Sequence, residues 1–91
     1  MESTTRKQYD FWNNRIRNKT VYEIPGIGRA FGEILTENGY SMAYHLLGEY
    51  LIHNMDKDLF EATLKAKIPK INKQQAGNIT AALATWCELN L

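Results

Sequence analysis

The chain has few of the residues that stabilise secreted proteins or span membranes. Cys87 is the only cysteine among 91 residues, so no internal disulfide can form, and this favours a reducing compartment, the cytosol or the nucleus. No apolar run approaches the length of a membrane span and nothing resembles a signal peptide, so we expect no membrane insertion. The length suits one domain, and we expect residues 1–91 to form it.

Motifs for catalysis and metal binding are also missing. The chain has no phosphate-binding loop, nucleophile elbow or zinc motif. His45 and His53 are eight positions apart, more than two helical turns, so they cannot hold one metal ion without other ligands. We therefore expect structural or surface roles for both histidines, with no metal, no cofactor and no enzymatic activity.

The net charge is only +1, but the charges are segregated along the chain. Residues 1–29 carry a net +3, residues 30–64 a net −5 and residues 65–73 a net +4. A basic cluster usually does no more than solvate a surface. Here both basic segments adjoin stretches with the pattern of a helical hairpin, which makes them candidate contacts for a polyanion.

Glycine and proline are scarce, yet three of them fall within Ile24–Gly28. A short apolar helix is predicted to end at Pro25, because proline cannot continue a helix. A second helix is predicted from about residue 28 to residue 38, with Gly39 as its stop. Its buried stripe is predicted to be Phe31, Ile34 and Leu35. Short helix, Gly-Ile-Gly turn and helix together are typical of a helix-hairpin-helix motif.

Such a turn predicts an anion site. Gly26 and Gly28 allow positive φ and, lacking Cβ, let the backbone approach a surface closely. The free N–H groups of the turn and the positive end of the second helix then favour a backbone phosphate, with Arg29 beside it. Phosphates carry no sequence information, so such a site binds DNA without reading bases. The alternative is a simple tight turn in which Ile27 fills the core.

The segment from Ile68 to Ile79 repeats this pattern forty-four positions later. Isoleucine, proline, isoleucine and a basic residue recur in step, while the two glycines become Lys70 and Asn72. Asparagine tolerates the left-handed region, and Asn72 can form a capping box with Gln75. We therefore predict a second, degenerate hairpin, followed by a last helix over residues 73–88.

The remaining segments also predict helices. Thr5 and Gln8 form a possible capping box for a helix through Asn13. Ser41 is expected to cap a helix through His53 that carries apolar residues on more than one face, and Asp56 one over residues 57–65. The inward residues of the latter are expected to be Leu59, Phe60 and Leu64. No strand pattern occurs, so the predicted fold is all-α, an orthogonal bundle of five to six short helices.

With these residues in view, the chain resembles the barrier-to-autointegration factor family over nearly its whole length. The matching segments keep their order, with one apparent insertion between Lys73 and Trp86. They are Arg6-Lys7 with Asp10-Phe11, Gly26-Ile27-Gly28 with Gly32 and Leu35, Gly39-Tyr40, Ala43-Tyr44 with Leu47-Gly48 and Leu51, Asp56 to Phe60, Leu64-Lys65, Lys73-Gln74 and Trp86-Cys87.

The resemblance implies a small SAM-like helical homodimer that binds and bridges double-stranded DNA without sequence preference. In that family the DNA surface is the amino-terminal helix, the Gly-Ile-Gly hairpin and the start of the last helix. Lys7, Gly26, Gly28 and Lys73 match it. With the residues that flank them, the expected DNA-binding set is Arg6, Lys7, Gly26, Ile27, Gly28, Arg29, Lys70, Asn72 and Lys73.

The resemblance also implies a location in the nucleus, at chromatin and the nuclear envelope, and in the cytoplasm. It further implies partners and a form of regulation. The family binds LEM-domain proteins of the inner nuclear membrane, and lamins, through an apolar dimer groove. Its residues here would be Phe11, Gly48, Leu51, Ile52 and Leu59. Phosphorylation at the amino terminus releases DNA in the family, and the matching candidates are Ser3, Thr4 and Thr5.

Several positions depart from the family pattern. Two lysine pairs are replaced by Glu33-Ile34 and Asn54-Met55, and a tryptophan is replaced by Thr63. An arginine that the family has in the last helix would fall near Ala76 or Gly77 and is missing here. The lost basic residues weaken DNA binding. The alternative function is therefore a protein–protein adaptor that kept the fold and groove, acting by heterodimerising with a family member.

Overall fold

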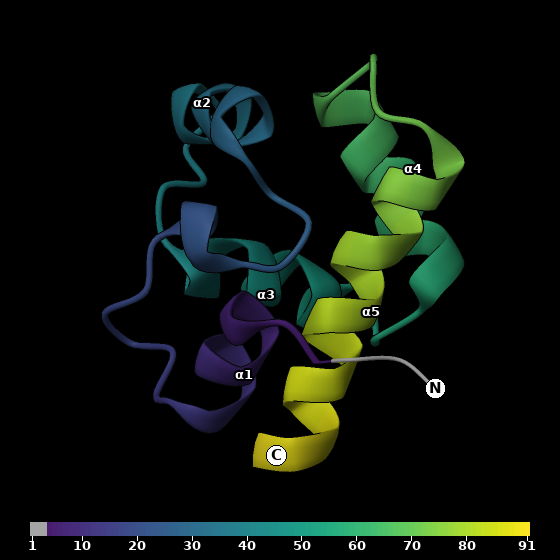
Figure 1. Ribbon diagram of the computed structural model, residues 1–91. Helices are drawn as coiled ribbons and strands as arrows, with labels where there is room; N and C mark the ends of the chain where they lie inside the picture. Colours follow the sequence, from purple (N-terminus) through teal and green to yellow (C-terminus); the bar gives the residue numbers. More distant parts are fainter. Residues whose placement is uncertain (1–3) are drawn as a thin grey trace.

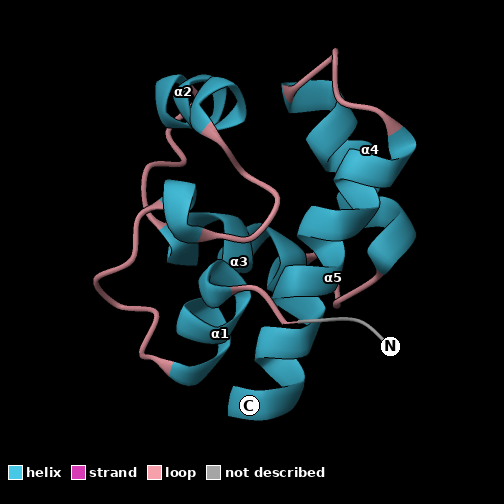
Figure 2. Cartoon of the chain, viewed as in Figure 1, coloured by secondary structure: helices cyan, strands magenta, loops and turns pink. Residues whose placement is uncertain are grey.

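The computed structural model describes residues 4–91, and these are helical with short connections (Figures 1 and 2). Apart from one isolated bridge between Thr20 and Met42, the described part contains no β-structure. The prediction of an all-α fold with five to six short helices is confirmed. The elements are α1 (Arg6–Asn13), the 3-10 helix η1 (Val21–Glu23), α2 (Arg29–Glu37), α3 (Ala43–Ile52), α4 (Lys57–Lys67) and α5 (Lys73–Asn90).

Three of the predicted helix starts are confirmed. The Thr5 hydroxyl accepts from the Gln8 N–H at 3.1 Å, while the Gln8 side chain accepts from the Thr5 N–H at 2.8 Å. The same reciprocal pair joins Asn72 and Gln75 at the start of α5. Asp56 caps α4 by accepting from the Leu59 N–H at 3.0 Å. Each contact satisfies a backbone donor that the first turn of a helix leaves free.

The prediction that Ser41 caps the third helix is wrong, because Met42 occupies the N-cap position. The chain here is held by backbone pairing instead. The Ser41 carbonyl accepts from the Val21 N–H at 2.9 Å, and the Ala43 N–H donates to the Lys19 carbonyl at 2.9 Å. These bonds form the isolated bridge and fix the start of α3 against the segment that precedes η1.

The end of α2 follows the expectation for Gly39. This residue has φ +92°, its N–H donates to the Thr36 carbonyl, and the Tyr40 N–H donates to the Leu35 carbonyl at 2.8 Å. This pair of bonds is a Schellman motif, which needs a left-handed residue after the helix. The expected stripe on α2 is buried only at Leu35, while Phe31 and Ile34 are half-buried against the core.

α5 is the element on which the others pack. It contacts α1, α3 and α4, and it runs through the molecule as the longest helix (Figure 1). The Trp12 indole N–H donates to the Ala82 carbonyl at 3.2 Å and ties α1 to it. The fully buried side chains come from all the helices and both turns, among them Phe11, Ile24, Ile27, Leu46, Phe60, Ile68, Ile71 and Ile79.

The Gly-Ile-Gly turn packs directly on α5. Gly26 has φ +95°, a conformation that L side chains rarely adopt, and a Cβ there would lie 2.9 Å from Ile79 Cγ1. Gly28 has φ −99°, and nothing lies within 4 Å of the place that its Cβ would occupy. The expectation of positive φ therefore holds for Gly26 and is wrong for Gly28.

Replacing these two glycines separates their roles in stability. We expect Gly26→Ala to destabilise the fold by roughly 1–3 kcal/mol, since it combines backbone strain with overpacking against Ile79. Gly28→Ala, the matched control two residues away, should change the free energy of unfolding by less than about 0.5 kcal/mol. Urea unfolding followed by circular dichroism measures both. Equal losses for the two variants would contradict this account of the turn.

Candidate nucleic-acid interface

The two predicted hairpin turns share one backbone hydrogen bond. The Ile27 N–H donates to the Ile24 carbonyl at 3.0 Å, and the Ile71 N–H donates to the Ile68 carbonyl at 2.9 Å. All four isoleucine side chains are buried. The predicted internal repeat is thus present in three dimensions, with each turn anchored by a pair of isoleucines and followed by a helix.

The residues that begin the two following helices also match. Gly28 precedes α2 with φ −99° and ψ −161°, and Asn72 precedes α5 with φ −95° and ψ 172°. Both are therefore extended, and the expectation that Asn72 uses the left-handed region is wrong. The difference lies in the side chain, because Asn72 caps its own helix while Gly28 has nothing with which to cap α2.

The amino terminus of α2 is consequently open. The first N–H groups of a helix have no partner within it, and at this end they carry the positive part of the helix dipole. The Gly28 carbonyl accepts the first helical bond, from the Gly32 N–H at 2.9 Å. With no Cβ at Gly28 and open space beside it, an anion can reach these N–H groups.

The structure brings the two turns together at this point. A surface depression of about 450 Å³ is lined by residues from both hairpins. From the first hairpin come Gly26, Gly28, Arg29, Ala30 and Phe31, and from the second come Lys70 and Gln75. Arg29 and Lys70, two basic residues of the expected DNA-binding set, therefore line one depression with the open end of α2.

Lys7 is attached to the first turn. Its ammonium group donates to the Ile27 carbonyl at 2.7 Å, which links α1 to the hairpin across 20 positions of sequence. Partial burial lowers the pKa of Lys7, and the negative charge of Glu23 opposes this shift. A lysine ammonium has three donors, so Lys7 keeps hydrogens for a second acceptor such as a phosphate oxygen.

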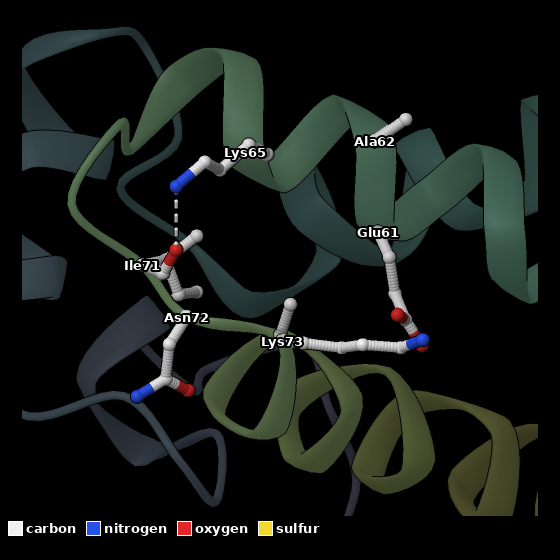
Figure 3. Close-up of a pocket in the computed structure, with 7 residues that line it drawn as sticks. Glu61, Ala62, Lys65, Ile71, Asn72 and Lys73 are labelled. Atoms are coloured by element: carbon white, nitrogen blue, oxygen red, sulfur yellow. Dashed lines mark hydrogen bonds between the residues drawn. The ribbon is translucent and has the colours of Figure 1, made fainter.

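Lys65 makes the corresponding contact at the second turn. Its ammonium group donates to the Pro69 carbonyl at 2.6 Å and to the Ile71 carbonyl at 2.9 Å. Lys73, the first residue of α5, lines a neighbouring pocket of about 310 Å³ together with Lys65 and Glu61 (Figure 3). The sequence marked Lys65 as part of a basic segment and of the family resemblance, and no spacing pattern pointed to its contact with the turn.

Three residues of the expected DNA-binding set have other contacts within the chain. Ile27 is buried, its N–H is bonded to Ile24 and its carbonyl to Lys7, so the prediction that it contacts DNA is wrong. It fills the core, as the alternative interpretation held. Arg29 is 91% exposed, but it pairs with Glu33 at 3.4 Å. The Arg6 side chain is 94% exposed, and its Nε lies 4.0 Å from Asp10 Oδ2.

The expected partner groove is exposed at four of its five residues. Gly48, Leu51, Ile52 and Leu59 all reach the surface, with Ile52 75% exposed. Leu59 is 53% exposed, so its predicted inward orientation is wrong. The inclusion of Phe11 is also wrong, because its side chain is fully buried in the core and cannot touch a partner.

The histidines have structural contacts, as expected. His45 Nδ1 accepts from the Met42 N–H at 3.1 Å, in the place where a capping side chain would stand. His53 Nε2 lies 3.1 Å from the Thr63 hydroxyl and 3.4 Å from Glu49, whose other oxygen accepts from the Tyr40 hydroxyl. Within residues 4–91, no group of three or more potential ligand side chains is placed to hold a metal ion.

Two of the three phosphorylation candidates lie beside α1. Thr4 and Thr5 are exposed, and Thr5 serves as the N-cap. Ser3 lies outside the described residues.

None of the described helices is long and apolar enough to cross a membrane.

Comparisons with known proteins agree with this geometry. The family model described as Barrier to autointegration factor matches residues 2–90. The barrier-to-autointegration factor of Danio rerio is 36% identical over 88 residues, with 97% of each chain covered. That of Drosophila melanogaster is 35% identical over 88 residues with the same coverage, and that of Homo sapiens is 34% identical over 86 residues, covering 94% of this chain and 96% of the human one. The chain therefore belongs to the barrier-to-autointegration factor family.

Proposed function

We propose that the chain binds double-stranded DNA through its phosphate backbone, without sequence preference and without enzymatic activity. The observation that carries this proposal is the depression in which both hairpin turns meet, with Gly28 leaving the start of α2 open. Membership of the family supports it. The chemistry is that of an anion site made of backbone N–H groups and a helix dipole.

The charged residues around the depression would extend this contact along the DNA. Lys70 lines it, Lys7 contacts the first turn from α1, and Lys73 begins α5. Their ammonium groups bind phosphates as point charges and release counterions, so affinity must fall steeply with salt concentration. The glycines and the lysines offer no planar pair of donors and acceptors for a base edge, which is why sequence preference is not expected.

Dimerisation would combine two such sites in one particle that can bridge two DNA duplexes. The exposed apolar residues Leu51, Ile52, Met55 and Leu59 gather at the end of α3 and the start of α4, beside the bare backbone of Gly48. A patch of this kind favours a partner. We propose that two copies pair through it, or one copy with a family member, so that a dimer carries two DNA sites and can link two duplexes.

The same surface suits the other partners expected for this family. We propose that the paired chains bind LEM-domain proteins of the inner nuclear membrane, and lamins, through the apolar groove that includes Ile52 and Leu59. The working location would be chromatin and the nuclear envelope, with a further pool in the cytoplasm.

A second candidate function is supported by the Arg29–Glu33 pair. Glu33 places a carboxylate one helical turn beyond the start of α2, where it pairs with the nearest arginine and adds negative charge near the anion site. On this alternative the chain is a protein–protein adaptor with weak DNA binding. The two functions differ in which variants impair binding to DNA and which impair binding to a LEM-domain partner.

The DNA proposal predicts a graded response to substitution. Gly28→Glu should nearly abolish binding to a duplex, because it places bulk and negative charge where the phosphate must lie. Lys7→Ala and Lys73→Ala should each lower the slope of log affinity against log salt by about one unit, since each removes one ion contact. Fluorescence anisotropy at several salt concentrations measures both effects.

The control for charge is Thr36→Glu, which adds the same carboxylate to an exposed position at the far end of α2. It should bind DNA nearly as well as the unmodified chain. If folded Gly28→Glu binds as tightly as Thr36→Glu, the anion site is not where DNA binds. If the unmodified chain binds weakly and only Ile52→Glu impairs LEM-domain binding, the adaptor function is favoured.

The assembly proposal predicts a dimer in sedimentation at tens of micromolar, on the order of usual working concentrations. Ile52→Glu should yield monomers, because a carboxylate buried in an apolar interface is strongly unfavourable. Tyr9→Glu, on the exposed side of α1, is the matched control and should remain dimeric. A monomer for the unmodified chain would contradict the proposed bridge.

Phosphorylation is predicted to release DNA. A phosphate on Thr4 or Thr5 adds about −1.5 to −2 charge beside Arg6 and Lys7 and repels the DNA backbone. The phosphomimetic pair Thr4→Glu with Thr5→Glu should therefore bind a duplex more weakly than Thr4→Gln with Thr5→Gln, which matches it in size. Equal affinities would show that this switch does not operate here.

A further inference from the structure

We propose that Lys65 is a positioning residue. By donating hydrogen bonds to the carbonyls of Pro69 and Ile71, it holds the second hairpin turn in its DNA-binding geometry. The inference rests on the proposed DNA binding and adds a residue to it. Lys65 would act through the turn and not by touching a phosphate.

The contacts occur at equivalent positions of the two repeats. Ile27 and Ile71 are the second isoleucines of their turns, both are buried, and the carbonyl of each accepts from a lysine ammonium. The donors come from unrelated places in the sequence, Lys7 on α1 and Lys65 in the last turn of α4. A lysine ammonium therefore binds the corresponding carbonyl in both turns.

The physical reason is the direction in which the turn carbonyls point. The Ile71 N–H is bonded to Ile68, but the carbonyls of Pro69 and Ile71 are bound by Lys65. A carbonyl left without a donor is costly and presents partial negative charge beside Asn72 and Lys73, where a phosphate would approach. Lys65 also lies at the carboxyl end of α4, where a cation is favoured by the helix dipole.

The second turn has a greater need of this contact than the first. The first turn has Gly26 at φ +95°, whereas the second has Lys70 in its place, and among residues 4–91 the only non-glycine residues at positive φ are Asn54 and Met55. Without the freedom of glycine, the chain holds its peptide orientation through the two bonds from Lys65. Figure 3 shows the Lys65 ammonium group directed at the Ile71 carbonyl from the facing helix.

This arrangement also assigns the lysines different tasks. Two of the three donors of the Lys65 ammonium group are already bound to carbonyls. Lys70, in the depression between the turns, and Lys73, at the start of α5, are left to meet the phosphates.

Salt titrations of DNA binding test the proposal with the full-length chain. Lys65→Met should lower affinity for a duplex by about tenfold while leaving the salt slope unchanged, because the loss acts through the turn. Lys73→Met should reduce the slope by about one unit. Lys65→Arg should restore affinity, since guanidinium can also donate to two carbonyls. Lys57→Met, which removes the same charge from the exposed first turn of α4, should leave affinity unchanged.

A second readout does not depend on DNA. In the free protein, Lys65→Met should shift the NMR resonance of the Ile71 carbonyl carbon and leave that of Ile27 in place, with the helical circular dichroism spectrum retained. If Lys65→Met loses its helical spectrum, the same comparison is made with Lys65→Gln, which keeps one donor.

The outcomes separate this proposal from the proposed function. An unchanged Ile71 resonance overturns the role of Lys65 whatever the DNA result. An unchanged affinity in Lys65→Met, a slope reduced by about one unit, or an equal loss in Lys57→Met also overturns it. A shifted Ile71 resonance in a chain that does not bind DNA at all refutes the DNA-binding function and with it the positioning role, while the lysine–carbonyl contact stands.

Discussion

The rest of the structure depends on the burial of four isoleucines in two equivalent turns. Ile24 and Ile27 anchor the first, Ile68 and Ile71 the second, and all four are enclosed by the core around α5. Between these inward side chains, Gly26 of the first turn and Pro69 and Lys70 of the second lie at the surface. The same short segments therefore contribute side chains to the core and backbone groups to the surface. A change that disturbs the packing of the isoleucines also moves the exposed part of the turn.

Lysine side chains complete these turns from outside. The contacts of Lys7 with Ile27 and of Lys65 with Ile71 fix a positive charge beside each turn. Glu33 acts in the other direction at the start of α2. The strength of the anion site is thus a balance between cations that are fixed by backbone contacts and one carboxylate at its edge.

Much of the fold could be predicted from the sequence because its signals are local. Thr5 with Gln8, Asp56, Asn72 with Gln75 and Gly39 each determine a helix end through contacts within a few residues. The errors arose where distant segments decide. Ser41 lost its capping role to a backbone bridge with residues 19–21, and Phe11 was assigned to the surface although α5 and its neighbours enclose it. The contacts of Lys7 and Lys65 with the turns are likewise tertiary, and no spacing in the sequence reveals them.

The polar contacts that join α3 and α4 have a consequence for the surface above them. Where the family resemblance implies a tryptophan, Thr63 bonds to His53, which lies beside Glu49, and Glu49 accepts from Tyr40. A large ring holds two helices apart by filling volume and tolerates small rotations. Hydrogen bonds have preferred directions, and they fix the rotation of one helix against the other. Ile52 and Leu59, on either side of this seam, are consequently presented at a spacing that depends on bond directions as well as on the packed rings of Tyr50 and Phe60.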